Sequence, residues 1–242
     1  MAETLFYILL PLTAFLYASV GHGGASGYLA LMALFSFSPE VMKPTALLLN
    51  LFVAGISFVQ FARAGHFQWR LFVVFAVLSI PLSFLGGMLE LDPQWYKFTL
   101  GVLLLFAVAR MIGLFDKAKM SLNELNWPIG ILVGGSIGFF SGLIGIGGGI
   151  ILSPVILLLR WGSIKEAAAV SALFIWMNSL AGLTGQLRFG FELSPNIWLM
   201  TGLTLIGGFA GGTAGSFFVG KKQMKLILSV VLVLASVKLI FI

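Results

Sequence analysis

The sequence predicts an all-α protein that crosses a membrane several times and folds as two inverted repeats, each with a glycine-broken helix pair. Three observations lead to this class. The 242 residues are 60% hydrophobic and 9% charged, whereas soluble domains carry about 25% charged residues. Apolar runs recur from end to end of the chain, and a membrane-spanning helix needs about 20 such residues. Two glycine clusters interrupt these runs at corresponding places in the two halves.

Ten apolar segments follow one another, and we expect the chain to change side at each. A transmembrane β-barrel would instead show alternating segments of about 10 residues. The N-terminus lacks the positive region of a signal peptide, because Glu3 is its only charge. Cysteine is absent, which excludes disulfides, thiolate metal sites and cysteine nucleophiles. The segments are 4–20, 24–38, 44–62, 71–89, 96–113, 128–144, 148–160, 167–186, 196–219 and 224–241.

Basic residues are divided unequally between the two sets of connections, which predicts the orientation. Lysine and arginine mark the cytoplasmic side, so the net charge of +6 reflects topology and not nucleic-acid binding. Both termini are therefore expected outside. Tryptophans 69, 95, 127, 161 and 198 lie near segment ends, as in an aromatic belt. The cytoplasmic set holds Arg63, Arg70, Arg110, Lys117, Lys119, Arg160, Lys165, Lys221, Lys222 and Lys225. The outer set holds Lys43, Lys97, Arg188 and Lys238, with Glu3, Glu40, Glu90, Asp92 and Glu192.

An internal repeat accounts for the two glycine clusters. "YASVGHGGASGYL" (17–29) returns as "FSGLIGIGGGIIL" (140–152), and "FLGG" (84–87) returns as "FAGG" (209–212). "FARAG" (61–65) aligns in the same way with "QLRFG" (186–190). Because each half holds five segments, an odd number, the second half is expected to be inverted, as in many transporters. The predicted organisation is a first repeat over 1–113, a cytoplasmic linker over 114–127 and a second repeat over 128–242.

The segments after each glycine cluster are too short to span. Segments 24–38 and 148–160 give about 20 Å of helix, against a hydrocarbon core of about 30 Å. We interpret the clusters as tips of broken or re-entrant helix pairs that meet near the bilayer midplane. The free N–H groups and positive helix ends of these tips favour an anion. The alternative is close helix packing, which we favour for Gly134 and Gly138. The predicted backbone site comprises Gly23, Gly24 and Ala25 with Gly147, Gly148 and Gly149.

Polar side chains inside the apolar segments supply further candidates. Thr45, Asn50, Ser171 and Asn178 are predicted to complete an oxyanion cage as hydrogen-bond donors; the alternative is hydrogen bonding between helices. Gln60 and Gln186 lie near segment ends.

Few charged or titratable residues are placed to take part in transport. His22, between Gly21 and Gly23, is the candidate proton site, because histidine changes charge near neutral pH. Arg63 and Arg188 are candidate vestibule charges, although we favour interface anchoring as the explanation for both. No carboxylate lies in the middle of a segment, which argues against a sodium cage or an acidic proton relay. Neither a metal nor a cofactor is expected.

The chain resembles the sulfite exporter TauE/SafE family of membrane transporters. The residues that carry the resemblance are "GHGGASG" (21–27), "KPTALLLNLFVAG" (43–55), "ARAGHFQWRLF" (62–72), "GIGGG" (145–149) and "AAAVSALFIWMNSLAGL" (167–183). The resemblance implies a multi-pass carrier in the bacterial inner membrane for sulfur-containing anions such as sulfite or organosulfonates. Ala25 stands where the second half has Gly149, and His22 corresponds to Ile146, so His22 is a departure from the duplicated pattern.

The predicted function is therefore a secondary carrier of small anions and not an enzyme. Export of an anion from a cell that is negative inside gains about 2.3 kcal/mol per charge per 100 mV, so gradient and potential suffice. The alternatives are a passive anion channel and an anion/proton uptake carrier for another small oxyanion. An intramembrane hydrolase would need a serine paired with histidine, or paired carboxylates, and one histidine without a buried carboxylate does not favour it. The expected partners are the substrate and the bilayer.

Overall fold

The computed structural model describes residues 2–19, 21–111, 122–187, 190, 192–217, 233, 236–237 and 240. Across these residues it contains α-helices and no strand, which confirms the predicted class. The helices, in chain order, are α1 (Ala2–Ala18), α2 (Ala25–Leu34), α3 (Pro39–Arg63), α4 (Trp69–Gly87), α5 (Pro93–Met111), α6 (Trp127–Ile144), α7 (Gly149–Leu159), α8 (Ile164–Gln186) and α9 (Ile197–Phe217).

These nine helices correspond to the first nine predicted segments, while most of segment 224–241 lies outside the described residues. Their starts carry local signals that the sequence supplies. Ser163 and Glu166 form a capping box at α8, and the Asn126 side chain accepts the Ile129 N–H at α6. Pro39 begins α3, a position where proline loses no helical hydrogen bond.

α2 and α7 are short, as expected, with 10 and 11 residues. Every residue of α2 from Ala25 to Ala33 is buried. Half-length helices leave backbone groups at membrane depth, which is tolerated only where protein or a water-filled cavity surrounds them. The tips 21–24 and 145–148 therefore lie inside the protein and not against lipid.

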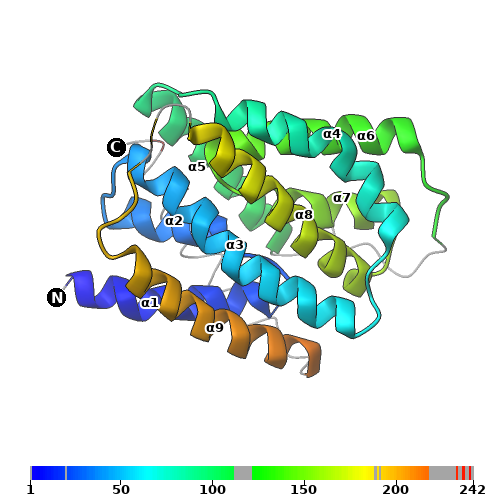
Figure 1. Cartoon of the computed structure of the whole chain (residues 1–242), viewed down its shortest axis with the longest axis horizontal. Helices are drawn as coiled ribbons and strands as arrows, with labels where there is room; N and C mark the ends of the chain where they lie inside the picture. The colour runs from blue at the N-terminus through cyan, green and yellow to red at the C-terminus, as the bar shows by residue number, and fades with distance from the viewer. Residues whose placement is uncertain are drawn as a thin grey trace.

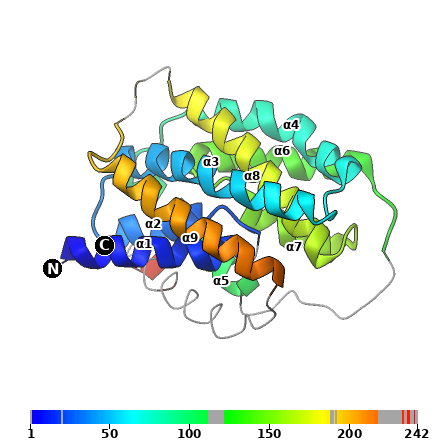
Figure 2. The same ribbon diagram turned by 60° about the horizontal axis from the view of Figure 1, so that its bottom comes forward.

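The helices run roughly side by side, with α3 and α8 packed together in the middle (Figures 1 and 2). On one side α4 packs against α6, and on the other α1 packs against α9. Glycines bring these outer pairs into backbone contact. Gly134 and Gly138 of α6 face the backbone of α4, and Gly207 and Gly211 of α9 face the backbone of α1. The packing role favoured for Gly134 and Gly138 is thus observed.

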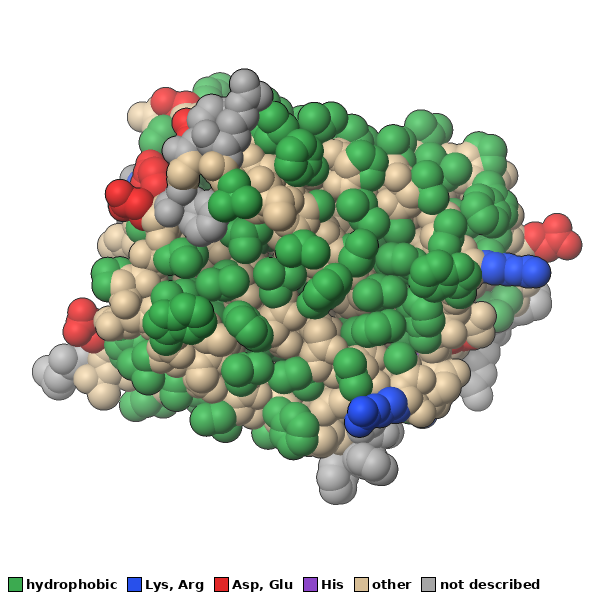
Figure 3. Space-filling view, in the orientation of Figure 1, with side chains coloured by type: hydrophobic (Ala, Val, Ile, Leu, Met, Phe, Trp, Pro, Cys, Tyr) green, Lys and Arg blue, Asp and Glu red, His purple; other side chains and the backbone are tan. Residues whose placement is uncertain are grey.

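The surface between the two ends of the bundle is largely hydrophobic, and the charged side chains in view gather toward the ends (Figure 3). Within the described part of the chain, α3, α4, α6, α8 and residues 197–214 of α9 are long and apolar enough to cross a membrane. The protein is therefore a multi-pass membrane protein. Trp69, Trp95, Trp127 and Trp198 lie at helix starts and are exposed, whereas Trp161 is 9% exposed and packs against Phe75. Trp161 is thus a core residue and not part of an exposed belt.

The end of the bundle at which α1 and α3 begin, and α4 and α8 end, is called the N-terminal end (Figure 1). The opposite end carries the 64–68 connection between α3 and α4, and Arg63, which is exposed there. Arg188 lies outside the described residues.

Candidate functional site

Both tips turn on glycines in the left-handed backbone region. Gly24 (φ 98°) precedes α2, and Gly148 (φ 76°) precedes α7. Gly21 and Gly145, at the other ends of the tips, have φ values of 77° and 88°. Residues with a Cβ rarely adopt this conformation. The duplicated glycines therefore let each chain segment reverse and start a new helix within a few residues.

Asn50 lies between the two tips and binds both. Its Oδ1 accepts the Ala25 N–H at the start of α2, at 3.0 Å. Its Nδ2 donates to the Ile146 carbonyl oxygen of the second tip at 3.5 Å, and to Ser179 Oγ at 3.3 Å. Asn50 is fully buried, halfway along α3. One side chain of the first half thus ties together the two glycine clusters, which are 124 residues apart.

The space for Asn50 exists because its neighbours lack side chains. A Cβ at Gly23 would lie 2.5 Å from Asn50 Oδ1, and a Cβ at Gly147 would collide with Asn50 Nδ2. The same two positions would place a Cβ 3.0 Å from Ile175 Cγ2. Asn50 and Ile175 therefore fill the centre between the tips, and Gly23 and Gly147 fit against them.

His22 points from the first tip into the second half of the chain. Its Nε2 lies 3.2 Å from Ser153 Oγ on α7, and Ser153 Oγ lies 2.8 Å from Ser171 Oγ on α8. All three side chains are at most 3% exposed. Ser171 therefore reaches the first tip only through Ser153. The histidine is a member of a buried polar chain.

Two of the four predicted donors lie away from the tips. Asn178 accepts from Ser79 Oγ of α4 at 2.7 Å and donates to the Phe174 carbonyl at 2.8 Å. Thr45 Oγ1 accepts the Ser194 N–H at 3.4 Å, ahead of α9. Asn178 joins α8 to α4, and Thr45 holds the connection before α9. The structure therefore does not bring these two side chains to the glycine backbone.

Beside each helix start lies a buried hydroxyl that has no hydrogen-bond partner among the described residues. Tyr28 OH would lie 2.6 Å from a Cβ at Gly24, and Ser141 is adjacent to Gly148, with its Cβ 3.4 Å from a Cβ there. Tyr28 is 0% and Ser141 2% exposed. An unsatisfied buried hydroxyl is unfavourable. Each start therefore has a hydroxyl that a ligand oxygen could satisfy, and the glycines at the two N-cap positions supply no capping side chain of their own.

Sequence reasoning missed Ser153, Ser179, Ile175, Tyr28 and Ser141. Two signals could have found some of them. Positions 171, 175 and 179 recur every four residues and so share a helix face, which points Ser179 and not Asn178 toward Asn50. The repeat offset of 125 seen at "FLGG" and "FAGG" pairs Asn50 with Ile175.

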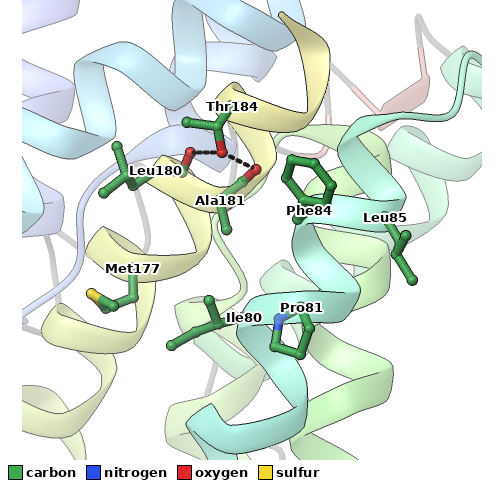
Figure 4. A pocket seen from close by; sticks show the side chains of 8 residues that line it. All are labelled: Ile80, Pro81, Phe84, Leu85, Met177, Leu180, Ala181 and Thr184. Atoms are coloured by element: carbon green, nitrogen blue, oxygen red, sulfur yellow. Dashed lines mark hydrogen bonds between the residues drawn. The ribbon is translucent and has the colours of Figure 1, made fainter. Parts of the chain in front are cut away.

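A shallow cavity between α4 and α8 does not suit an anion. Its volume is about 560 Å³ and its walls are apolar apart from Thr184 (Figure 4). The Thr184 hydroxyl donates back to the carbonyl groups of Leu180 and Ala181, at 3.0 and 2.8 Å. Among the residues described, no three His, Asp or Glu side chains are placed to hold a metal ion.

Comparison with known proteins agrees with the multi-pass helical fold. The sequence matches the family described as sulfite exporter TauE/SafE over residues 6–239. It is 38% identical over 235 residues to the probable membrane transporter protein y4hK of Sinorhizobium fredii, covering 94% of each chain. It is 26% identical over 227 residues to the probable membrane transporter protein YunE of Bacillus subtilis, covering 84% of this chain and 82% of that one. No solved structure matches. With this match over nearly its whole length, the chain belongs to the sulfite exporter TauE/SafE family of membrane transporters.

Proposed function

We propose that the protein is a secondary carrier of small sulfur-containing anions, such as sulfite or organosulfonates, that exports them along their gradient and the membrane potential. The observation that carries this is the Ala25 N–H, at a helix start, which already donates to an oxygen, Asn50 Oδ1. A helix N-terminus favours negative charge. A substrate oxygen would take the place of Asn50 Oδ1 there.

The partnerless hydroxyls of Tyr28 and Ser141 support the same site. An oxyanion carries several acceptor oxygens, so it can accept from a hydroxyl as well as from a backbone N–H. Neutral hydrogen-bond donors bind the anion without adding a fixed positive charge. This suits a carrier, which must release its substrate again.

We also propose that the bundle is an inverted repeat in the bacterial inner membrane, with 1–113 and 128–242 as its halves and 114–127 as the cytoplasmic linker. The matching glycine φ angles and the matching helix pairs, α4 with α6 and α9 with α1, support the duplication. The N-terminal end then faces outward.

Counterflow in proteoliposomes tests the function. Vesicles loaded with unlabelled anion should take up labelled anion faster than empty vesicles, and the rate should saturate. The panel is sulfite, sulfate, thiosulfate, sulfoacetate and taurine. Uptake that neither saturates nor responds to internal anion would identify a channel. Uptake that requires an inward proton gradient would favour the anion/proton carrier, for which the buried chain from His22 to Ser171 is the supporting observation.

A further inference from the structure

A second cavity, of about 860 Å³, opens at the N-terminal end of the bundle. It is bounded by the start of α3, the connection from α4 to α5, the end of α6 and the end of α8. Leu143 lines it, two residues before Gly145 of the second tip. The cavity thus leads from one end of the protein to the edge of the second glycine cluster.

Lys43 connects this cavity with the tip. Its Cγ would lie 3.1 Å from a Cβ at Gly145. Its Nζ donates to the carbonyl oxygens of Gly87, at 3.4 Å, and Leu89, at 3.2 Å, where α4 ends. The stem of Lys43 therefore lies against the tip, while its ammonium group is held at the end of α4 by two contacts that are long for a charged donor.

Gln186, the last residue of α8, supplies a second donor to the lining of the cavity. It lines the cavity and is 7% exposed, and its Nε2 has no hydrogen-bond partner in the described part of the chain. The preceding turn of α8 packs against α4, with Gly182 and Gly185 in contact with Gly87. Gly87 is therefore contacted both by the Lys43 ammonium group and by the turn of α8 that precedes Gln186. An acceptor in the cavity would satisfy the amide.

Four carboxylates also line the cavity: those of Glu40, Glu90, Asp92 and Glu192. A sphere of this volume is about 12 Å across, so much of it lies within the Debye length of about 8 Å. Salt therefore screens these charges only in part. Lys43 is the one cationic side chain among the described lining residues. Repulsion by the carboxylates would lower the affinity of Lys43 and Gln186 for an anion and favour its dissociation.

We propose that Lys43 and Gln186 form an anion-binding subsite between the second tip and the outside, and that the surrounding carboxylates keep its affinity low. The proposal rests on the proposed function, and it adds a release station on the outer side. Because of this low affinity, the half-saturating anion concentration should be higher on the outer face than on the inner face. Such an asymmetry suits export.

The test measures half-saturation on each face, in right-side-out and inside-out vesicles, with sulfite and ethanesulfonate as probes. Gln186→Leu removes an amide nitrogen that has no partner to lose, so the fold should tolerate it. It should raise the outer half-saturating concentration about tenfold, equivalent to about 1.4 kcal/mol, and leave the inner one unchanged. Glu90→Gln with Asp92→Asn should lower the outer value. The matched control is Gln60→Leu, a glutamine near the opposite end of α3 that also has a partnerless amide atom.

The subsite would be overturned if Gln186→Leu changed the half-saturating concentration equally on both faces or only in inside-out vesicles. It would also be overturned if Gln186→Leu and the Glu90→Gln, Asp92→Asn variant shifted the outer value in the same direction. A thermal-shift titration of purified protein with ethanesulfonate separates this from a failure of the proposed function. If ethanesulfonate stabilises wild type, Gln186→Leu weakens this stabilisation and vesicles show no transport, then the carrier function is refuted and the subsite is retained. Equal stabilisation of both proteins, or none in wild type, would remove the subsite.

Discussion

Replacing Asn50 by aspartate tests whether the start of α2 is where the anion binds. The substitution preserves size and keeps an oxygen on the Ala25 N–H, now as a carboxylate. In wild type, an arriving anion has to displace a neutral amide oxygen from that group, 3.0 Å away. In the variant it meets a fixed negative charge. At about 5 Å and an effective dielectric constant of about 20, the repulsion is about 3 kcal/mol. Binding should therefore weaken about a hundredfold.

Isothermal titration of purified Asn50→Asp with sulfite measures this loss, and Asn50→Ala is its control. Alanine removes the three hydrogen bonds of the amide and should lower the free energy of unfolding by about 2–4 kcal/mol. It also frees the Ala25 N–H, so sulfite binding should persist at a temperature where the variant is folded. The reasoning is refuted if Asn50→Asp binds sulfite as tightly as wild type, or if Asn50→Ala loses binding while folded.

Three further outcomes are expected. Gly148→Val should abolish sulfite binding in titrations, because φ is +76° and Ile137 and Phe174 leave no room, while Gly202→Ala, with no atom within 4 Å of a Cβ, should bind normally. His22→Gln should still bind substrate but lose the pH dependence of counterflow between about pH 5.5 and 7.5; an unchanged profile would show that His22 is not the proton site. Single cysteines at Ala2 and Ser121 should react with an impermeant thiol reagent from opposite sides, and labelling from one side would contradict the inverted repeat.

The fold was predictable because it depends on periodic, local signals. Apolar run length fixed the number of described helices, and glycine clusters marked the breaks before α2 and α7. The prediction that the two tips could meet near the middle agrees with Asn50, which contacts Ala25 and Ile146. Composition and glycine spacing are properties of the chain itself. They need no knowledge of which side of a helix faces which neighbour.

The side-chain part of the site was harder because it depends on helix rotation. A rotation of about 100° per residue separates Asn178 from Ser179, and this decides between a contact with α4 and a contact with Asn50. The sequence predicted Asn50 and Asn178 alike as donors at the tips, whereas the packed structure places Ile175, and not Asn178, beside Gly23 and Gly147 together with Asn50. No motif or repeat in the sequence singles out Ser153, because only the fold brings it to His22.

The glycine seams that join α4 to α6 and α1 to α9 have a mechanical consequence. Each seam holds one helix from either half of the chain at backbone contact, so the described helices of the two halves are interleaved. The helices instead group around the central contact of α3 with α8: α1, α2 and α9 pack with α3, and α4, α6 and α7 pack with α8. Each group carries one glycine tip. The plane between them passes through the contact of α3 with α8, where Asn50 reaches across. A rocking motion of one helix group against the other would therefore break the hydrogen bonds of Asn50. Each of these two groups contains helices from both halves of the sequence.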